Sequence, residues 1–179
     1  MENIVLGLLL LKSMTIYELN QAFSMGLSMI YAASYGNLQY AMKKLLSADM
    51  IAFDEKVENG RNKKIYHIKQ GGIAAFFSWM MSDADPKHIE TIMLSKVYFL
   101  GLVDSDSDKL IIIDKILAAA GEYAKELAQV KSTIGRLQLG DDEMRIAKYQ
   151  FATLGYGIGA YDFAISWLKD IKEEIEKSK

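Results

Sequence analysis

The chain lacks cysteine altogether and has one proline and two histidines among its 179 residues. The lack of cysteine excludes disulfide bonds and thiolate metal sites, and it is typical of a protein from a reducing compartment. His67 and His88 lie far apart in the sequence and show no ligand spacing. We therefore expect no bound metal ion and no other cofactor.

Long hydrophobic runs are also missing from the start of the chain. The longest run there, Ile4–Leu11, has eight residues, which is too short to span a bilayer. Glu2 occupies a position where a secretory signal peptide would carry Lys or Arg. These features predict a cytoplasmic protein without a membrane partner.

Catalytic and ion-binding motifs are not found either. The acidic run Asp104–Asp108 resembles the start of a calcium loop, but that loop needs Gly and Glu where Lys109 and Lys115 stand. A helix start capped by Ser105 or Ser107 explains the run better. Because the sequence has no nucleophile elbow and no phosphate-cradling glycine loop, we do not expect an enzyme.

Hydrophobic residues make up 51% of the chain, enough for a large core and for a buried subunit interface. The formal net charge is −2, but the charges are unevenly distributed. Residues 1–80 hold eight Lys or Arg and six Asp or Glu, whereas residues 81–179 hold thirteen and seventeen. A mildly basic front and an acidic back fit two tasks in one chain.

Three helices are predicted before residue 50. The apolar run Ile4–Leu11 favours a short buried helix, and Thr15 with Glu18 forms a capping box for a second helix that ends near Gly26. Ser34 can cap a third helix over residues 34–49. Its apolar positions recur every three or four residues, as in a half-buried helix: Leu38, Ala41, Met42, Leu45 and Leu46.

Two short strands follow, the first marked by Ile51, Phe53 and Val57 and the second by Ile65 and Ile68. The stretch ENGRN between them supplies a hairpin turn, and a helix over about residues 73–81 closes the unit. The order helix, helix, helix, strand, turn, strand, with cations at the hairpin tip, is typical of a winged helix. There the third helix reads base edges in the major groove and the cations of the hairpin bind phosphates.

A solvated hairpin is the alternative explanation for the cations, because most charge runs have water as their partner. The order of the elements favours DNA binding more than the charge does. On that interpretation the third helix presents an exposed polar face made of Tyr35, Asn37, Gln39, Tyr40 and Lys43.

Several motifs occur in a fixed order: IVLGLLLLKSMTIYEL, SYGNLQYAMKKL, GRNKKIY, and Gly72 followed by Trp79. They resemble ILGLLL…MTGYEL, S-x-G-x-[IL]-Y-P-A-L-x-x-L, GRxxKxY and the closing glycine and tryptophan of the PadR family of bacterial winged-helix transcription regulators. The back half, in SKVYFLGLVD and LGYGIGAYDFAISWLKDI, is similar to the helical C-terminal region of the longer members. The resemblance covers nearly the whole chain.

The resemblance implies phosphate contacts from four residues, Tyr17, Ser34, Lys64 and Tyr66. It also implies that Arg61 and Lys63 lie at the tip of the wing. For Tyr17 and Tyr66, packing in the core is an equally good explanation.

Beyond Pro86 the pattern changes to long heptad repeats. Apolar residues recur at alternating spacings of three and four from Ile116 to Leu137 and again from Met144 to Leu168. Gly140 and the acids after it suit a turn, so two long antiparallel helices are predicted, with another helix over residues 89–102. The expected domains are a winged-helix DNA-binding domain, residues 1–82, and a helical dimerisation domain, residues 83–179.

Three glycines, at positions 155, 157 and 159, interrupt the second repeat, where each costs about 1 kcal/mol relative to alanine. Close approach of another helix offsets this cost, either inside the chain or across a dimer. Winged-helix repressors read palindromes as twofold dimers, which favours the dimer. The expected dimer interface is Phe151, Leu154, Gly155, Ile158, Gly159, Tyr161, Ile165 and Leu168.

Aromatic and methionine side chains of the back half suit an adaptable apolar site. The candidate lining of an effector pocket is Trp79, Met93, Tyr98, Phe99 and Trp167. Packing in the core is the alternative and the commoner role of such residues. Family members that sense phenolic acids or drugs give the effector interpretation its support.

We therefore expect a mainly α-helical PadR-like transcriptional regulator that binds a palindromic operator in double-stranded DNA as a homodimer. We expect it to be a repressor that a small apolar or aromatic effector releases. The alternative is a winged-helix adaptor that binds a protein partner and no specific DNA.

Overall fold

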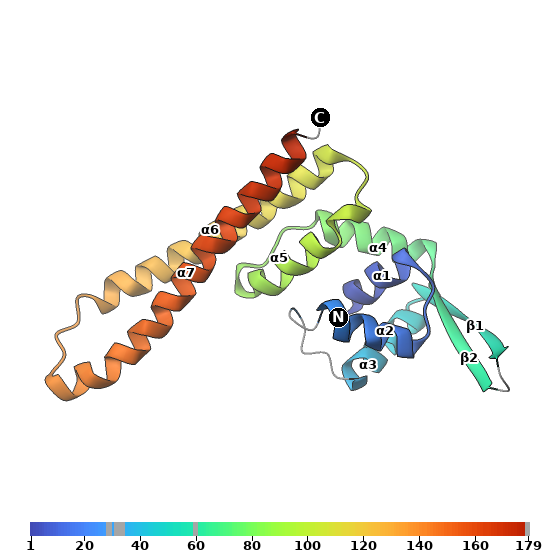
Figure 1. The fold of residues 1–179 in the computed structure, drawn as a ribbon, viewed down its shortest axis with the longest axis horizontal. Coiled ribbons are helices and arrows are strands. Elements are labelled where there is room, and N and C mark those ends of the chain that lie inside the picture. The colour runs from blue at the N-terminus through green and yellow to red at the C-terminus, as the bar shows by residue number, and fades with distance from the viewer. Residues whose placement is uncertain (28–29, 31–34, 59–60, 178–179) are drawn as a thin grey trace. The chain divides into compact units, whose positions relative to one another are not determined.

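The computed structural model describes residues 1–27, 30, 35–58 and 61–177. The described chain consists of seven α-helices with short helical turns and one two-stranded antiparallel hairpin (Figure 1), which confirms the predicted fold class. It divides into two compact units, Met1–Ser82 with Leu94–Phe99 and Asp83–Met93 with Leu100–Lys179. Within the described ranges, no helix combines the length and the apolar character that a membrane crossing requires.

The first unit is built around α1 (Glu2–Leu11), which is buried along most of its length. Its apolar sequence makes it a central helix that contacts α3, α4 and β2. The next helix, α2 (Ile16–Ala22), continues as a π-helical turn over Phe23–Leu27, so the helical segment ends one residue beyond the predicted stop at Gly26.

The third helix, α3 (Tyr35–Ser47), buries the apolar face that its periodicity predicts. Leu38, Ala41, Met42 and Leu45 are each at most 3% exposed. The predicted cap, Ser34, lies outside the described residues.

The hairpin consists of β1 (Ile51–Glu58) and β2 (Arg61–Ile68), paired from Ile51 opposite Ile68 to Glu58 opposite Arg61. Both strands fall where they were predicted. Met14 forms an isolated β-bridge with Tyr66 of β2: the N–H of Met14 donates to the carbonyl of Tyr66 (3.0 Å), and the N–H of Tyr66 donates to the carbonyl of Met14 (2.8 Å). The base of the hairpin is therefore attached to the segment that leads into α2.

The helix α4 (Gln70–Met81) begins three residues before its predicted start, because Gly71 and Gly72 belong to its first turn. A Cβ atom on Gly72 would collide with the carbonyl oxygen of Met50, so glycine allows α4 to pack against the chain that enters β1. Further along α4, Phe76 is fully buried and its ring packs edge-on against that of Phe99, with centroids 5.6 Å apart.

The second unit contains the first half of α5 (Ile89–Tyr98) and two long helices, α6 (Asp106–Ile134) and α7 (Asp141–Lys177). The predicted helix over 89–102 is shorter than expected, because α5 ends at Tyr98 and a 3₁₀ turn follows over Leu100–Leu102. The helix start within the acidic run is confirmed, since Ser105 Oγ accepts a hydrogen bond from the N–H of Asp108 (3.2 Å).

The two long helices lie antiparallel, as predicted (Figure 1). Lys172 Nζ is 2.6 Å from Asp114 Oδ1, and the ring centroids of Tyr123 and Tyr161 are 4.7 Å apart. The first contact joins the start of α6 to the end of α7, and the second joins residues nearer the turn between the two helices. The heptad periodicity of both sequences therefore serves, at least in part, the packing of α6 on α7 within one chain.

Substituting Gly72 by Ala is expected to lower the stability of the first unit by about 1–3 kcal/mol, because the added methyl group has no room beside the Met50 carbonyl. Gly71→Ala is the matched control: nothing lies within 4 Å of its Cβ position, and a better helix former there should stabilise by up to about 1 kcal/mol. Urea unfolding measures both, and equal effects of the two variants would contradict the packing explanation.

Candidate nucleic-acid interface

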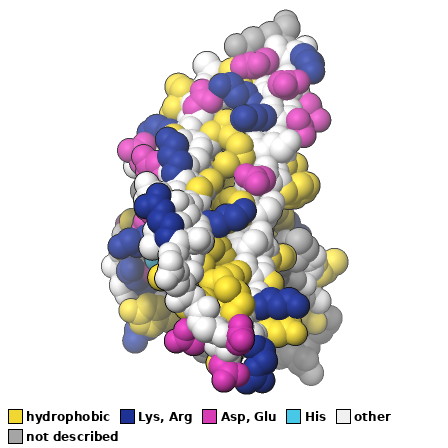
Figure 2. All heavy atoms as spheres, turned by 90° about the vertical axis from the view of Figure 1, so that its left-hand side faces the viewer, with side chains coloured by type: hydrophobic (Ala, Val, Ile, Leu, Met, Phe, Trp, Pro, Cys, Tyr) yellow, Lys and Arg dark blue, Asp and Glu magenta, His cyan; other side chains and the backbone are white. Residues whose placement is uncertain are grey.

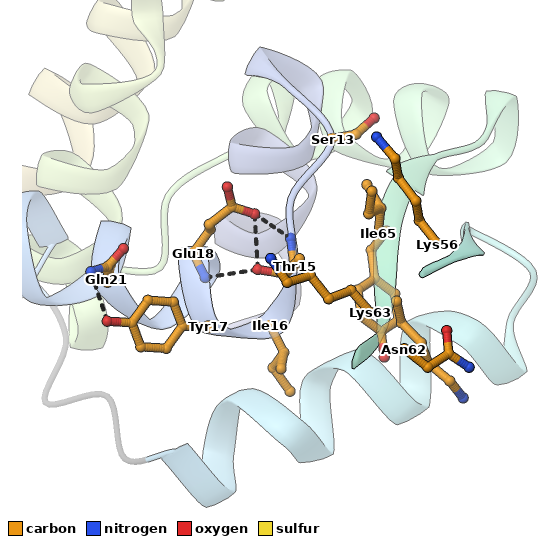
Figure 3. A pocket seen from close by; sticks show the side chains of 12 residues that line it. Ser13, Thr15, Ile16, Tyr17, Glu18, Gln21, Lys56, Asn62, Lys63 and Ile65 are labelled. Atoms are coloured by element: carbon orange, nitrogen blue, oxygen red, sulfur yellow. Dashed lines mark hydrogen bonds between the residues drawn. The ribbon is translucent and has the colours of Figure 1, made fainter. Parts of the chain in front are cut away.

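The start of α2 is fixed by the predicted capping box (Figure 3). Thr15 Oγ1 accepts a hydrogen bond from the N–H of Glu18 (3.2 Å). In return, Glu18 Oε2 accepts hydrogen bonds from the backbone N–H of Thr15 (2.7 Å) and from its hydroxyl (2.8 Å). Together with the Met14–Tyr66 pairing, these bonds hold the first turn of α2 beside β2.

The same hydrogen bonds keep Glu18 charged. The backbone N–H of Thr15, and then its hydroxyl, lower the pKa of Glu18 below the ordinary value of 4.5. Lys12 and Lys63 lower that pKa further by electrostatic attraction. Lys63 therefore extends from β2 to within electrostatic reach of the start of α2.

A groove of about 860 Å³ lies between the start of α2 and the hairpin (Figure 3). The groove is lined by three lysines and one carboxylate, together with hydroxyl and amide groups, so it carries a net positive charge. The lining residues are Ser13, Thr15, Ile16, Tyr17, Glu18, Gln21, Lys56, Asn62, Lys63, Lys64, Ile65 and Tyr66. Four of the residues predicted to bind DNA, Tyr17, Lys63, Lys64 and Tyr66, are therefore brought to one groove.

The two tyrosines of this groove differ in burial. Tyr17 is 66% exposed, so it does not belong to the core. Its hydroxyl oxygen accepts a hydrogen bond from Gln21 Nε2 (3.1 Å), which leaves the hydroxyl proton free to be donated elsewhere. Tyr66 is half-buried beside Phe53, with ring centroids 5.6 Å apart; burial raises its pKa, and the charge of Tyr35 adds to the effect.

The hairpin places its lysines on two opposite faces, because successive side chains of a strand alternate. On one face Lys64 lies opposite Glu55, with its Nζ 3.8 Å from Glu55 Oε1 and 4.1 Å from the centroid of the Phe53 ring. On the other face Lys63 lies directly opposite Lys56. Figure 3 shows Lys63 reaching toward Thr15 and Lys56 toward Ser13.

The outer face of α3 is polar, as predicted. All five of its candidate residues are exposed: Tyr35, Asn37, Gln39, Tyr40 and Lys43. The helix is held from the other side by its buried apolar residues and by an ion pair between Lys44 Nζ and Glu2 Oε1 (2.9 Å). A rigid helix with an exposed row of amide, hydroxyl and ammonium groups can form hydrogen bonds with the edges of bases.

Two of the predicted DNA-binding residues are not placed by the structure. Ser34 lies outside the described residues. Arg61 begins β2 opposite Glu58, but its side chain lies outside what the structure describes.

Sequence reasoning missed Lys56, Ser13 and Gln21 as lining residues of the groove. The signal for Lys56 was present in the sequence. The strands pair residue 58 with 61 and residue 56 with 63, so a prediction of the hairpin register would have identified Lys56 as the cross-strand partner of Lys63.

The residues predicted for a dimer interface lie on different sides of α7. Leu168 is fully buried and Tyr161 packs on Tyr123, so both serve the packing of α7 on α6. Gly155 and Gly159 face open space, with nothing within 4 Å of a Cβ built on either. The remaining members are half-buried: Phe151, Leu154, Ile158 and Ile165.

The residues predicted to line an effector pocket fall in both units. Phe99 and Met93 are buried, at 1% and 4% exposure, as core residues are. Trp79 packs beside Phe76 in the first unit, with centroids 5.8 Å apart, while Tyr98 is exposed and Trp167 half-buried. A hollow of about 400 Å³ occurs elsewhere, near the turn between α6 and α7, lined by Ile134, Leu137, Leu139, Glu143, Ile146, Ala147, Gln150 and Phe151.

No group of three or more potential metal ligands occurs among the residues whose placement is described.

Comparison with known proteins gives matches among solved structures only. No family model and no curated protein matches the chain. Bacillus subtilis PadR in complex with operator DNA is 17% identical, with 97% of this chain and 98% of that chain covered and a TM-score of 0.43. The smu.1604c protein of Streptococcus mutans is 25% identical, with coverages of 99% and 98% and a TM-score of 0.43.

The PadR-like transcriptional regulator BC1756 of Bacillus cereus is 22% identical, with coverages of 97% and 94% and a TM-score of 0.41. The chain thus resembles PadR and PadR-like regulators over nearly its whole length. At these identities and TM-scores, function has to be inferred from the residues of this chain.

The capping box should make stability depend on pH. Because the pKa of Glu18 is lowered in the folded chain, its charge stabilises the fold above the ordinary pKa of 4.5, and the contribution is lost as pH falls through the folded value. Glu18→Ala is expected to cost about 0.5 kcal/mol near pH 7, at the low end for a cap because the group is exposed.

Urea unfolding of the native chain and of this variant from neutral to acidic pH measures the difference. The difference should narrow on acidification. A Glu18→Gln variant keeps hydrogen-bonding capacity without the charge, so it separates the two contributions. A difference between the native chain and the Ala variant that grows toward acid pH would refute the assignment.

Proposed function

We propose that this chain is a PadR-family transcriptional regulator that binds a palindromic operator in double-stranded DNA as a homodimer. By occupying a promoter it acts as a repressor. The observation that carries the proposal is the combination, within one unit, of an exposed polar helix, α3, and a cationic groove beside a hairpin. Residues 1–82 bind the DNA, and residues 83–179 provide the dimer contacts.

The helix α3 is suited to the major groove. Its exposed amides, Asn37 and Gln39, have the donor and acceptor pair that matches adenine, and Lys43 can bind a phosphate or a guanine edge. The buried face of the same helix keeps it fixed on α1, so it can enter the groove without rearrangement.

The hairpin supplies affinity that does not depend on base sequence. Its lysines carry the charge that attracts the phosphate backbone, and Tyr17 offers a hydroxyl proton at the groove. The net charge of −2 for the whole chain does not oppose this, because the acidic residues concentrate beyond residue 80.

A second copy explains the outer face of α7. Tyr149, Tyr156 and Phe163 are spaced by seven residues and are 71%, 80% and 72% exposed. Figure 2 shows hydrophobic side chains at the surface of the helical hairpin, between groups of charged ones. Gly155 directly precedes Tyr156, and Gly159 lies between Tyr156 and Phe163 in the sequence. Nothing lies within 4 Å of a Cβ built on either glycine, which leaves room for another helix to approach closely.

We therefore place the dimer contact of the proposal on Tyr149, Tyr156 and Phe163 with the two glycines, rather than on the residues that face α6. An exposed row of three aromatic side chains is unusual on a monomer, and a twofold partner would bury it. Release by a small apolar or aromatic effector stays a prediction.

Selection of bound fragments from the source genome, followed by fluorescence anisotropy on the recovered duplexes, tests the proposed function. We expect enriched fragments to share a palindrome whose half-sites are about one helical turn apart. If the enriched fragments share no sequence and a protein partner is captured instead, the chain is an adaptor and the proposal fails.

On such a duplex, Gln39→Ala should weaken binding by about 1–3 kcal/mol and relax the preference at one base pair in each half-site. Lys43→Gln is the matched control on the same helix face. We expect it to weaken binding to all sequences and to lower the salt dependence of binding, without changing the preferred bases. Anisotropy titrations against single-base variants of the operator measure both, and an unchanged preference in the Gln39 variant would contradict base reading by that residue.

The double substitution Tyr156→Lys and Phe163→Lys should convert the dimer to a monomer of 20.1 kDa, because four like charges would meet at the twofold contact. Glu122→Lys, an exposed charge change on α6, is the control and should leave the dimer intact. Light scattering at micromolar concentration reads the mass. A native chain that is already monomeric would remove the dimer from the proposal.

A further inference from the structure

We propose that the hollow near the turn between α6 and α7 binds a small apolar molecule that carries a protonated amine. Every residue that lines the hollow belongs to the second unit, so the site is complete within that unit. Its apolar walls hold the body of the ligand, and the carboxylate of Glu143 binds the ammonium group. The inference goes beyond the proposed function, because none of these residues belongs to the DNA-binding unit.

The walls of the hollow are apolar side chains that remain at the surface. Leu137 is 55% exposed and Ile146 is 59% exposed, and Ile134, Leu139 and Phe151 are half-buried. Figure 2 shows hydrophobic side chains between charged ones at the end of the helical hairpin that faces the viewer. Connecting segments are usually polar, so the two leucines in this one indicate a surface that an apolar group covers.

The size of the hollow suits a small molecule. Its volume of about 400 Å³ is within the range of roughly 300–1,000 Å³ that is typical of small-molecule sites. Phe151 offers a ring against which an aromatic ligand can pack, and the aliphatic walls offer no hydrogen bonds. The site therefore favours a compact ligand with an aromatic or aliphatic body.

Glu143 determines which head group the ligand carries. It is the one charged side chain among the described residues that line the hollow. Its Oε2 atom accepts a hydrogen bond from the N–H of Gly140 (3.0 Å), which holds the carboxylate beside the apolar walls. A ligand that covers the walls removes water from this carboxylate, so it has to supply a donor in return. A protonated amine does so with both charge and hydrogen bonds.

Two further observations agree with a cationic ligand. Within the described chain, neither Oε1 of Glu143 nor the side-chain amide of Gln150 has a hydrogen-bond partner, so both can accept hydrogen bonds from the amine. The nearby cation Arg145 lies beside Asp142, with Nη2 3.9 Å from Oδ1, and does not line the hollow. A carboxylic acid would therefore meet the charge of Glu143 without a lining cation to bind it.

The test uses the full native chain with isotope-labelled methyl groups on its Ile and Leu residues. Three probes share one apolar body and differ in head group: phenylbutylamine, phenylbutanol and phenylbutyric acid. Each probe is titrated at neutral pH and followed by methyl NMR. We expect saturable shifts of the methyl signals of Ile134, Leu137 and Ile146, with the amine bound about 5-fold more tightly than the alcohol. The acid should bind most weakly.

Two variants of neighbouring acids isolate the role of Glu143. E143Q keeps hydrogen-bonding capacity but loses the charge, so it should bind the amine about 5-fold more weakly and the alcohol as the native chain does. D142N is the matched control, because it removes the same charge from an exposed residue that does not line the hollow. It should keep the full preference for the amine. Both positions are exposed, so urea midpoints close to the native value are expected to verify folding.

Equal affinities for the three probes would overturn the inference, as would tighter binding of the acid or the absence of saturable shifts at these methyl groups. A loss of preference in D142N as large as that in E143Q would also overturn it, because binding would then follow the general acidity of the helix start. The titrations contain no DNA. Their failure therefore leaves the proposed regulator in place, and a failure of operator binding leaves the amine site in place.

Discussion

Two backbone hydrogen bonds between Met14 and Tyr66 set the geometry on which the candidate interface depends. They attach the hairpin to the segment just before α2, and the capping box at Thr15 then starts the helix one residue further on. Because the attachment uses backbone atoms, the groove between α2 and the hairpin is defined without any of the lysines that line it. The lysines of the groove are therefore not needed to hold the hairpin beside α2.

The helix α7 has two different faces along its length. One face packs on α6 through Tyr161 and Leu168, and the other presents Tyr149, Tyr156 and Phe163. A helix that is apolar on two faces cannot satisfy both within a hairpin of two helices. Within one copy of the chain, α7 therefore packs one apolar face on α6, and its other apolar face can be buried only by a partner.

Sequence reasoning identified the elements better than the partners of their side chains. The capping box, the two strands and the antiparallel long helices follow from local chemistry and periodicity, which act over a few residues. The early start of α4 was missed because two glycines weaken a helix signal, and only the close approach to Met50 explains Gly72. Heptads at 144–168 could not reveal which helix they face, and the importance of Lys56 depended on hairpin register.

Because side chains alternate between the two faces of a strand, an insertion in β2 changes which side chains share a face. The backbone of Tyr66 is hydrogen-bonded to Met14, so inserting one residue between Lys64 and Tyr66 would turn the side chains of β2 that precede the insertion to the opposite face. The lysine that now lies over Phe53 and the one that faces α2 would exchange environments, while two inserted residues would restore both. A related chain can therefore gain two residues in this strand and keep the same side chains on each face. A single inserted residue would exchange the side chains between the two faces.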